Sequence, residues 1–215
     1  MDRIRPLEPP HLGIRNALGQ VSFALGHTDF DDAGERVALC QLLGEVITIL
    51  RDHARQEDHY IFRPAEDAAP GSSAVDAAMH EQLEREIDAI GAAVALFDGT
   101  QTSNAVDEVI GAFREFHIRY LEHMLHEELT IEPILIAHRT DEEMIADQGE
   151  IMQTVDFGTL LLWFKYIVPA RRDTDNRQVL SAFRDAAPSE AFDAVCDVLR
   201  SVLPEARFEA LTSDL

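Results

Sequence analysis

Apolar residues recur at steps of three and four in four separate segments of the first two thirds of the chain. Residues spaced in this way lie on one face of an α-helix, so each segment predicts an amphipathic helix with one buried stripe. The stripes are His11, Ile14, Leu18, Val21 and Leu25; Leu39, Leu42, Val46, Ile49, His53 and Glu57; His80, Leu83, Ile87, Ile90, Val94 and Phe97; and Val109, Phe113, Phe116, Tyr120, His123 and Glu127. Stretches rich in Gly, Asp, Ser and Thr separate them at 26–32, 70–76 and 98–104. We therefore predict an all-α protein with an up-down-up-down four-helix bundle.

Each stripe carries polar residues at one of its ends. They are His11 and His80, near the starts of the first and third helices, and the pairs His53/Glu57 and His123/Glu127, near the ends of the second and fourth. In an up-down-up-down bundle, these starts and ends share one end of the molecule. At about 1.5 Å per residue, His80 lies roughly 27 Å from the turn at 98–99 and His123 roughly 28 Å beyond Asn104, so their levels match. The pattern predicts that six polar groups converge in one inward-facing layer.

The two halves of the bundle repeat one motif. His11 and His53 are 42 positions apart, His80 and His123 are 43 apart, and each second histidine has a glutamate at i+4. Two helical hairpins that each carry His…His-x-x-x-Glu would form an approximately two-fold symmetric site.

The buried carboxylates distinguish this layer from an ordinary polar patch in a core. A buried histidine is more often a hydrogen-bonded core residue than a ligand, and His-x-x-x-Glu pairs are common on helix surfaces. However, burying two carboxylates without a basic partner is unfavourable, and no Lys or Arg occurs on the four stripes. A cation would balance their charge. We therefore predict a metal site whose ligands are His11, His53, Glu57, His80, His123 and Glu127.

Other polar residues lie close to this layer in the sequence. The roles of His59 and His117 stay open between lining the site and supporting its ligands, whereas Tyr120 is expected to be a core residue with its hydroxyl near the metals. Glu84 lies at the flank of its stripe and could supply an extra ligand. His126 is expected in solvent.

Composition and charge narrow the class of protein. The chain has 215 residues, of which 46% are hydrophobic and 27% charged, as in a globular protein with a sizeable core. The net charge of −22 disfavours nucleic acids and anionic membrane surfaces as partners. The most apolar run, 157–168, is too short to span a bilayer. The two cysteines lie in apolar, helix-like segments and are expected to be free thiols, and no basic, apolar leader is visible, so we expect a cytoplasmic protein.

Residues 139–215 predict a C-terminal helical extension that follows a bundle at 1–138. Segment 157–168 is apolar on nearly all sides, so it should be buried, either against the bundle or in a homodimer interface. Residues 139–215 contain no histidine. We expect it to complete the core, with a dimerisation or signal-output role as the alternative.

The order His11, His53-x-x-x-Glu57, His80, His123-x-x-x-Glu127 resembles the hemerythrin-like, or HHE cation-binding, proteins. The segments "ED…FRP" at 57–64 and "EE…EPIL" at 127–135 also look like that family, and the resemblance covers roughly residues 5–138. It implies a non-haem centre of two iron ions, bridged by carboxylates and an oxo or hydroxo group. It also implies a small ligand such as O2, NO or peroxide.

The sequence departs from the oxygen-carrying hemerythrins on the third helix. Those proteins carry a His-x-x-x-His pair there, whereas this chain has Glu84 four residues after His80. The more open coordination disfavours a simple oxygen carrier and favours redox turnover or sensing. The ferritin-like di-iron class is also disfavoured, since it needs Glu-x-x-His on two helices and the chain has this spacing once, at Glu8 and His11.

The donor types do not select one metal. Imidazole and carboxylate ligands suit iron, zinc, manganese or copper. Iron is what the resemblance implies, and zinc or manganese in a purified sample would fit the same ligands.

The sequence supports three hypotheses for function. The first is a di-iron protein that binds O2, NO or peroxide for sensing or protection. The second is an enzyme that reduces peroxide or NO at open metal positions. The third is an iron-responsive signalling module in which the C-terminal extension, or tail, reports metal occupancy. A helical adaptor without metal is the remaining alternative.

Overall fold

The computed structural model describes residues 3–213, and the regular structure of these residues is entirely helical, which confirms the all-α prediction. The helices are α1 (Glu8–His27), α2 (Ala33–Glu57), the π-helical turn η1 (Asp58–Phe62), α3 (Arg63–Ala68), α4 (Ala74–Ala95), α5 (Ser103–His138), α6 (Asp141–Thr154), α7 (Phe157–Ala170), α8 (Asp173–Ala186), α9 (Ser189–Val202) and α10 (Glu205–Thr212).

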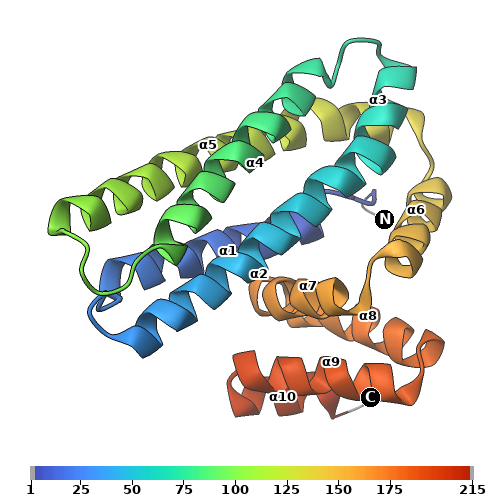
Figure 1. The fold of residues 1–215 in the computed structure, drawn as a ribbon. Helices are drawn as coiled ribbons and strands as arrows, with labels where there is room; N and C mark the ends of the chain where they lie inside the picture. Colours follow the sequence, from blue (N-terminus) through green and yellow to red (C-terminus); the bar gives the residue numbers. More distant parts are fainter. Residues whose placement is uncertain (1–2, 214–215) are drawn as a thin grey trace.

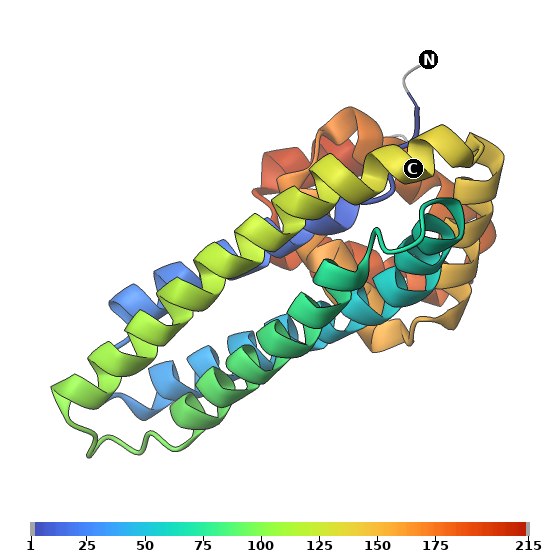
Figure 2. The same cartoon turned by 90° about the horizontal axis from the view of Figure 1, so that it is seen from above.

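Four long helices, α1, α2, α4 and α5, lie side by side (Figures 1 and 2). The contacts α1–α2, α2–α4, α4–α5 and α5–α1 close them into a ring around one apolar core. The predicted stripes supply this core with one shift, because Leu43 rather than Leu42 is fully buried on α2. Steps of four and then three from Leu39 fit a helix as well as steps of three and then four, so periodicity alone could not separate the two leucines.

Side-chain caps fix where several helices begin. The Asp32 carboxylate accepts a hydrogen bond from the Glu35 backbone N–H at 2.9 Å at the start of α2. At the start of α6, Thr140 and Glu143 form a reciprocal capping box. These residue types satisfy backbone N–H groups that have no partner within the first helical turn.

Helix α2 ends at Glu57, and the chain passes through the π-helical turn η1 before α3 begins at Arg63. Pro64 has no N–H to donate to the Tyr60 carbonyl four residues earlier, so one hydrogen bond of the regular α-helical pattern is missing at this point. The wider turn therefore directly follows a predicted ligand, Glu57. Turns of this kind occur frequently at functional sites.

The C-terminal helices α6–α10 lie against one end of the four long helices (Figures 1 and 2). Helix α7 contacts α1 and α2 and buries Tyr166 in their core. A second apolar cluster, which includes Leu160, Phe164 and Leu199, joins α7 to α9. Segment 157–168 thus packs within the chain, although Phe157 at its start is 45% exposed, and the division at residue 138 stays a prediction.

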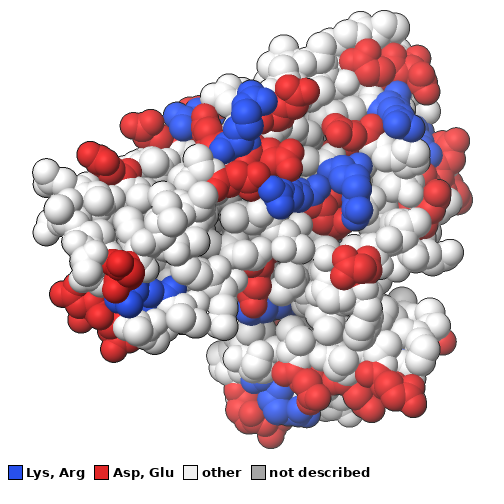
Figure 3. Space-filling model, viewed as in Figure 1, with Lys and Arg blue, Asp and Glu red and all other residues white. Residues whose placement is uncertain are grey.

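Within residues 3–213, no helix combines the length and the apolar character needed to cross a membrane. Figure 3 shows acidic side chains spread over one face, with basic side chains beside many of them. Cys40 and Cys196 are half-buried free thiols, as expected.

Candidate metal centre

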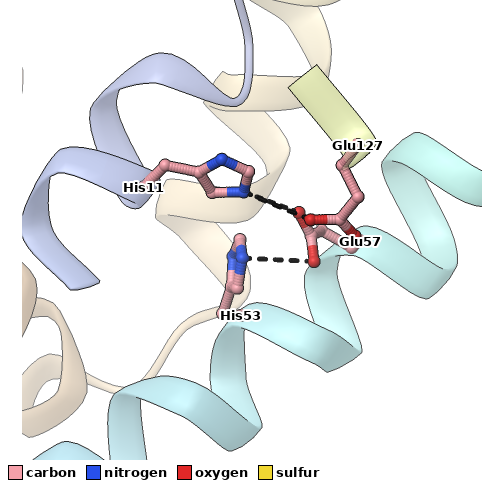
Figure 4. A group of neighbouring side chains, drawn as sticks. All are labelled: His11, His53, Glu57 and Glu127. Carbon is pink, nitrogen blue, oxygen red and sulfur yellow. Dashed lines mark hydrogen bonds and ion pairs between the residues drawn. The ribbon is translucent and has the colours of Figure 1, made fainter. Parts of the chain in front are cut away.

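The structure brings all six predicted ligands together between the four long helices. Helix α1 supplies His11, α2 supplies His53 and Glu57, α4 supplies His80, and α5 supplies His123 and Glu127. All six side chains are buried. Figure 4 shows the carboxylates of Glu57 and Glu127 lying together, with the rings of His11 and His53 directed toward them.

The donor atoms form two groups that share both carboxylates. One group contains His11, His53, Glu57 and Glu127, and the other contains His80, His123 and the same two glutamates. In each group, one ligand atom from every residue lies within 4.8 Å of all the others. Each group marks one candidate metal position with two histidines, and the two positions share both carboxylates.

The spacing within each group fits metal coordination. His53 Nε2 and His80 Nε2 each lie 3.2 Å from Glu57 Oε2, and His123 Nε2 lies 3.3 Å from Glu127 Oε1. His11 Nε2 lies 3.3 Å from Glu57 Oε1. Metal–ligand bonds of about 2.0–2.2 Å place neighbouring donor atoms about 2.8–3.1 Å apart in octahedral geometry and about 3.3–3.6 Å apart in tetrahedral geometry.

Several of these atoms lack any other partner. In the part of the chain that the structure describes, His53 Nε2, both nitrogens of His80 and of His123, and both oxygens of Glu127 are buried without a hydrogen bond. Buried polar atoms are almost always hydrogen-bonded in folded proteins, so such a concentration calls for an explanation. Imidazole nitrogens and carboxylate oxygens around a common centre are the donors that a divalent transition metal uses. The residues therefore fit a metal site.

Protonation would balance the carboxylate charge in the metal-free protein. Burial opposes a charge on His11, but its contacts with Glu128 and Glu57 outweigh burial and raise its pKa to about 9. Burial also opposes a charge on His80, but its contacts with Glu127 and Glu57 outweigh burial and raise its pKa to about 10. By contrast, burial lowers the pKa of His53 to about 3.

The two carboxylates also influence each other. Burial and the nearby charge of Glu57 raise the pKa of Glu127 to about 7. Burial also tends to raise the pKa of Glu57, but the nearby His53 and His11 outweigh burial and hold this pKa below the usual value. Glu57 is thus held ionised, whereas Glu127 is partly protonated near neutral pH.

Carboxylates also face the outer nitrogens of three ligand rings. His11 Nδ1–H donates to Glu128 Oε1 at 2.8 Å, and Arg15 holds the same oxygen at 2.9 Å. Asp76, which is buried, lies 3.6 Å from His123 Nδ1, and Asp58 lies 3.6 Å from His80 Nδ1. Glu128 is hydrogen-bonded to the His11 ring, and such a partner orients an imidazole and raises its basicity toward a metal.

The four apolar stripes do not include these outer carboxylates, although the sequence position of one of them gives a signal. Asp76 lies four residues before His80, so extending the third stripe by one turn would have reached it. Glu128 directly follows Glu127 and gives no periodic signal. Its role depends on how α1 approaches α5.

Apolar and aromatic side chains enclose the cluster. The Phe62 ring stacks on the His80 ring at 5.0 Å between centroids, and Tyr120 lies 5.9 Å from His123. Tyr120 is buried, as expected, and burial near Glu57 and Glu127 raises its pKa well above the usual value.

The tail reaches the site through one side chain. The Trp163 indole N–H of α7 donates to the Asp52 carboxylate at 2.7 Å, and its ring lies 6.3 Å from the His53 ring. Asp52 directly precedes His53 on α2. The tail therefore contacts the backbone segment that carries a predicted ligand.

Other polar residues considered in the sequence lie away from the cluster. Glu84 is on the surface, where Arg51 binds it at 3.1 Å, so it is not a neighbour of the six donors. His59 lines a surface pocket, and His117 is half-buried against Phe113. The expectation for His126 was incomplete, because this partly exposed ring bonds to the buried carboxylate of Asp76 at 2.8 Å.

Comparisons with protein-family models, with curated proteins and with solved structures found no match to this chain. What is established is an all-helical protein with a buried cluster of histidines and glutamates that could hold metal.

Proposed function

We propose that this protein is a hemerythrin-like di-iron protein that binds O2, NO or peroxide for sensing or protection. The observation that carries the proposal is the sharing of Glu57 and Glu127 by two histidine pairs. Two carboxylates common to both positions are the arrangement expected for bridging ligands between two ions. Each ion would then take two imidazoles and two carboxylate oxygens from the chain.

This donor set leaves part of the coordination sphere of a six-coordinate ion for exchangeable ligands. Iron bound there would supply reversible ligand binding or electron transfer to a small oxygen- or nitrogen-containing molecule. The protein would hold the ions through the six donors and orient the His11 ring through Glu128. Phe62 and Tyr120 would exclude bulk water from the site.

A signalling role is the second candidate, and the contact between α7 and the site favours it. Trp163 of α7 bonds to Asp52 of α2. A Cβ built on Gly13 of α1 would lie only 2.7 Å from Ile167, which is also on α7. Helix α7 therefore contacts the segments that carry His53 and His11. A change in ligand position on metal binding would be transmitted directly to the tail. Enzymatic reduction of peroxide or NO is the remaining alternative, and turnover assays with and without iron would distinguish it from binding.

The first test is metal stoichiometry. We expect metal-free protein loaded anaerobically with ferrous iron to retain two ions per chain, because the donors form two groups. Exposure to air should then produce a near-ultraviolet charge-transfer band typical of a bridged ferric pair. Elemental analysis and absorption spectroscopy measure the two quantities.

Matched histidine variants provide the control. His53→Ala should lose at least one ion and the band, whereas His138→Ala should retain both, since His138 lies in the last turn of α5 and bonds only to the Ile134 carbonyl. If the wild-type protein retains no metal, the proposed function is wrong.

A further inference from the structure

A surface pocket lies directly outside the histidine–glutamate cluster. It has a volume of about 430 Å³ and lies between η1, α3 and the start of α4. Phe62 forms part of its lining and stacks on the His80 ring. The Phe62 side chain thus contacts both this pocket and a residue of the cluster.

The face of α4 continues from the pocket to the cluster. Ser73 and Ala77 line the pocket, and His80 follows at steps of four and three on the same helix face. His80 is 8% exposed, the highest value among the six donor residues. Neither of its ring nitrogens has a hydrogen-bond partner, and Nδ1 faces the pocket residue Asp58 at 3.6 Å.

The charge of the pocket favours cations. Its lining includes three carboxylates, those of Asp58, Glu66 and Asp67, and one basic side chain, Arg63. Glu66 is fixed in place, because it accepts hydrogen bonds from Gly71 N at 2.6 Å and from Ser73 N at 2.8 Å. A pocket with an excess of one sign of charge raises the local concentration of ions of the opposite sign and their association rate.

We propose that this pocket is the route by which divalent metal ions reach the cluster, and that Phe62 controls passage. The inference rests on the proposed function, because it requires that the cluster binds metal. The carboxylates attract the hydrated cation to the pocket. Rotation of the Phe62 ring away from His80 then exposes the first imidazole donor, and the ion passes from oxygen ligands at the surface to nitrogen and oxygen ligands inside.

The experiment measures rates of metal uptake and loss in the full-length protein, with Co²⁺ as a spectroscopically visible probe. Phe62→Ala and the milder Phe62→Leu remove part or all of the barrier. We expect Phe62→Ala to accelerate both Co²⁺ uptake and chelator-driven Co²⁺ loss about tenfold, as a barrier lower by about 1.4 kcal/mol would. The ratio of the two rates, and hence the affinity, should stay unchanged, because Phe62 supplies no donor atom. Phe62→Leu should give a smaller change in the same direction.

Phe116→Ala is the matched control for general loosening of the core. Phe116 is also buried on the bundle axis, but it lies two turns before His123 and does not line the pocket. Equal acceleration by Phe116→Ala and Phe62→Ala would show that ions enter through overall opening of the bundle. Unchanged rates in both Phe62 variants, with the fold confirmed by circular dichroism, would also overturn the proposal.

Charge variants test the first step independently. Asp67→Asn should slow Co²⁺ uptake and weaken its dependence on ionic strength, whereas Asp107→Asn, which changes the net charge equally on an exposed part of α5, should not. Equal effects of both would contradict a local role of the pocket. If wild-type protein bound Co²⁺ with rates insensitive to all these changes, only this inference would fail. If it bound no Co²⁺, Fe²⁺ or Zn²⁺, the proposed function would fail with it.

Discussion

At the scale of the residue, the environment of a histidine decides its role. His53 and His126 both lie on long helices beside acidic residues, yet His53 is buried among other donors whereas His126 is partly exposed and bonded to Asp76. Among the buried histidines His11, His53 and His80, the surroundings also set the pKa. His11 and His80 lie against the ionised carboxylates and hold their protons, whereas burial keeps His53 neutral.

Proton release on metal binding is the prediction that belongs to this scale. Imidazole donors must be deprotonated to bind metal. With pKa values of about 9 and about 10, His11 and His80 are protonated at pH 7 in the metal-free protein. Filling both positions at pH 7 should therefore release about two protons per chain, with a further fraction from Glu127, whose pKa is about 7.

Calorimetric titration with Zn²⁺ in buffers of different ionisation enthalpy measures this number. Since protons and metal compete, the combined affinity for two ions should rise with pH from 7 toward 9 and become less dependent on pH above 10. His80→Ala should lower the number released by about one. Binding without proton release would show that the two rings are neutral in the metal-free protein.

At the scale of the element, the contact between α1 and α7 joins the bundle to the tail. Gly13 lies on the buried face of α1, two residues after His11, and faces Ile167 of α7. A Cβ at this position would lie 2.7 Å from Ile167 Cγ1 and 3.4 Å from the Ile167 backbone nitrogen. The two helices can approach this closely only because residue 13 has no side chain.

A pair of Gly→Ala variants on α1 tests that contact. Alanine favours a helix over glycine by about 1 kcal/mol, and Gly19 has nothing within 4 Å of an added Cβ, so Gly19→Ala should raise the free energy of unfolding. Gly13→Ala gains the same propensity but overpacks the interface, which typically costs about 1–3 kcal/mol. We expect Gly13→Ala to be the less stable of the two by about 1–3 kcal/mol in urea unfolding. Equal stability would mean that α7 moves away without cost.

At the scale of the whole molecule, the site exists only when the chain is folded. Its six donors come from four helices, and the outermost of them, His11 and Glu127, are separated by most of the length of the bundle sequence. An unfolded chain cannot hold these donors together. Metal that binds the native state preferentially therefore stabilises it by mass action.

Thermal unfolding with and without chelator tests this coupling. At a free metal concentration one hundred times the Kd, each ion should add about 2.7 kcal/mol to the free energy of unfolding. In a protein of this size, that corresponds to an increase in Tm of roughly 5–10 °C per ion. His53→Ala should reduce the increase, and His138→Ala should leave it unchanged. The same Tm in metal-loaded and chelated wild-type protein would argue against a site that depends on the fold.

The sequence by itself determined the helical class and the six inward-facing polar residues. Burial on a helix requires a periodic pattern, and the histidines and glutamates lie on that pattern in the printed sequence. Only the tertiary structure decided which oxygen faces which nitrogen and that both glutamates are shared by the two groups. It decided that Glu128 of α5 bonds to His11 and that Trp163 of α7 bonds to Asp52 beside His53. It also decided that Glu84 stays at the surface with Arg51. The reason is that periodicity fixes the face of a helix on which a residue lies, whereas the rotation and separation of packed helices fix which residues on different faces meet.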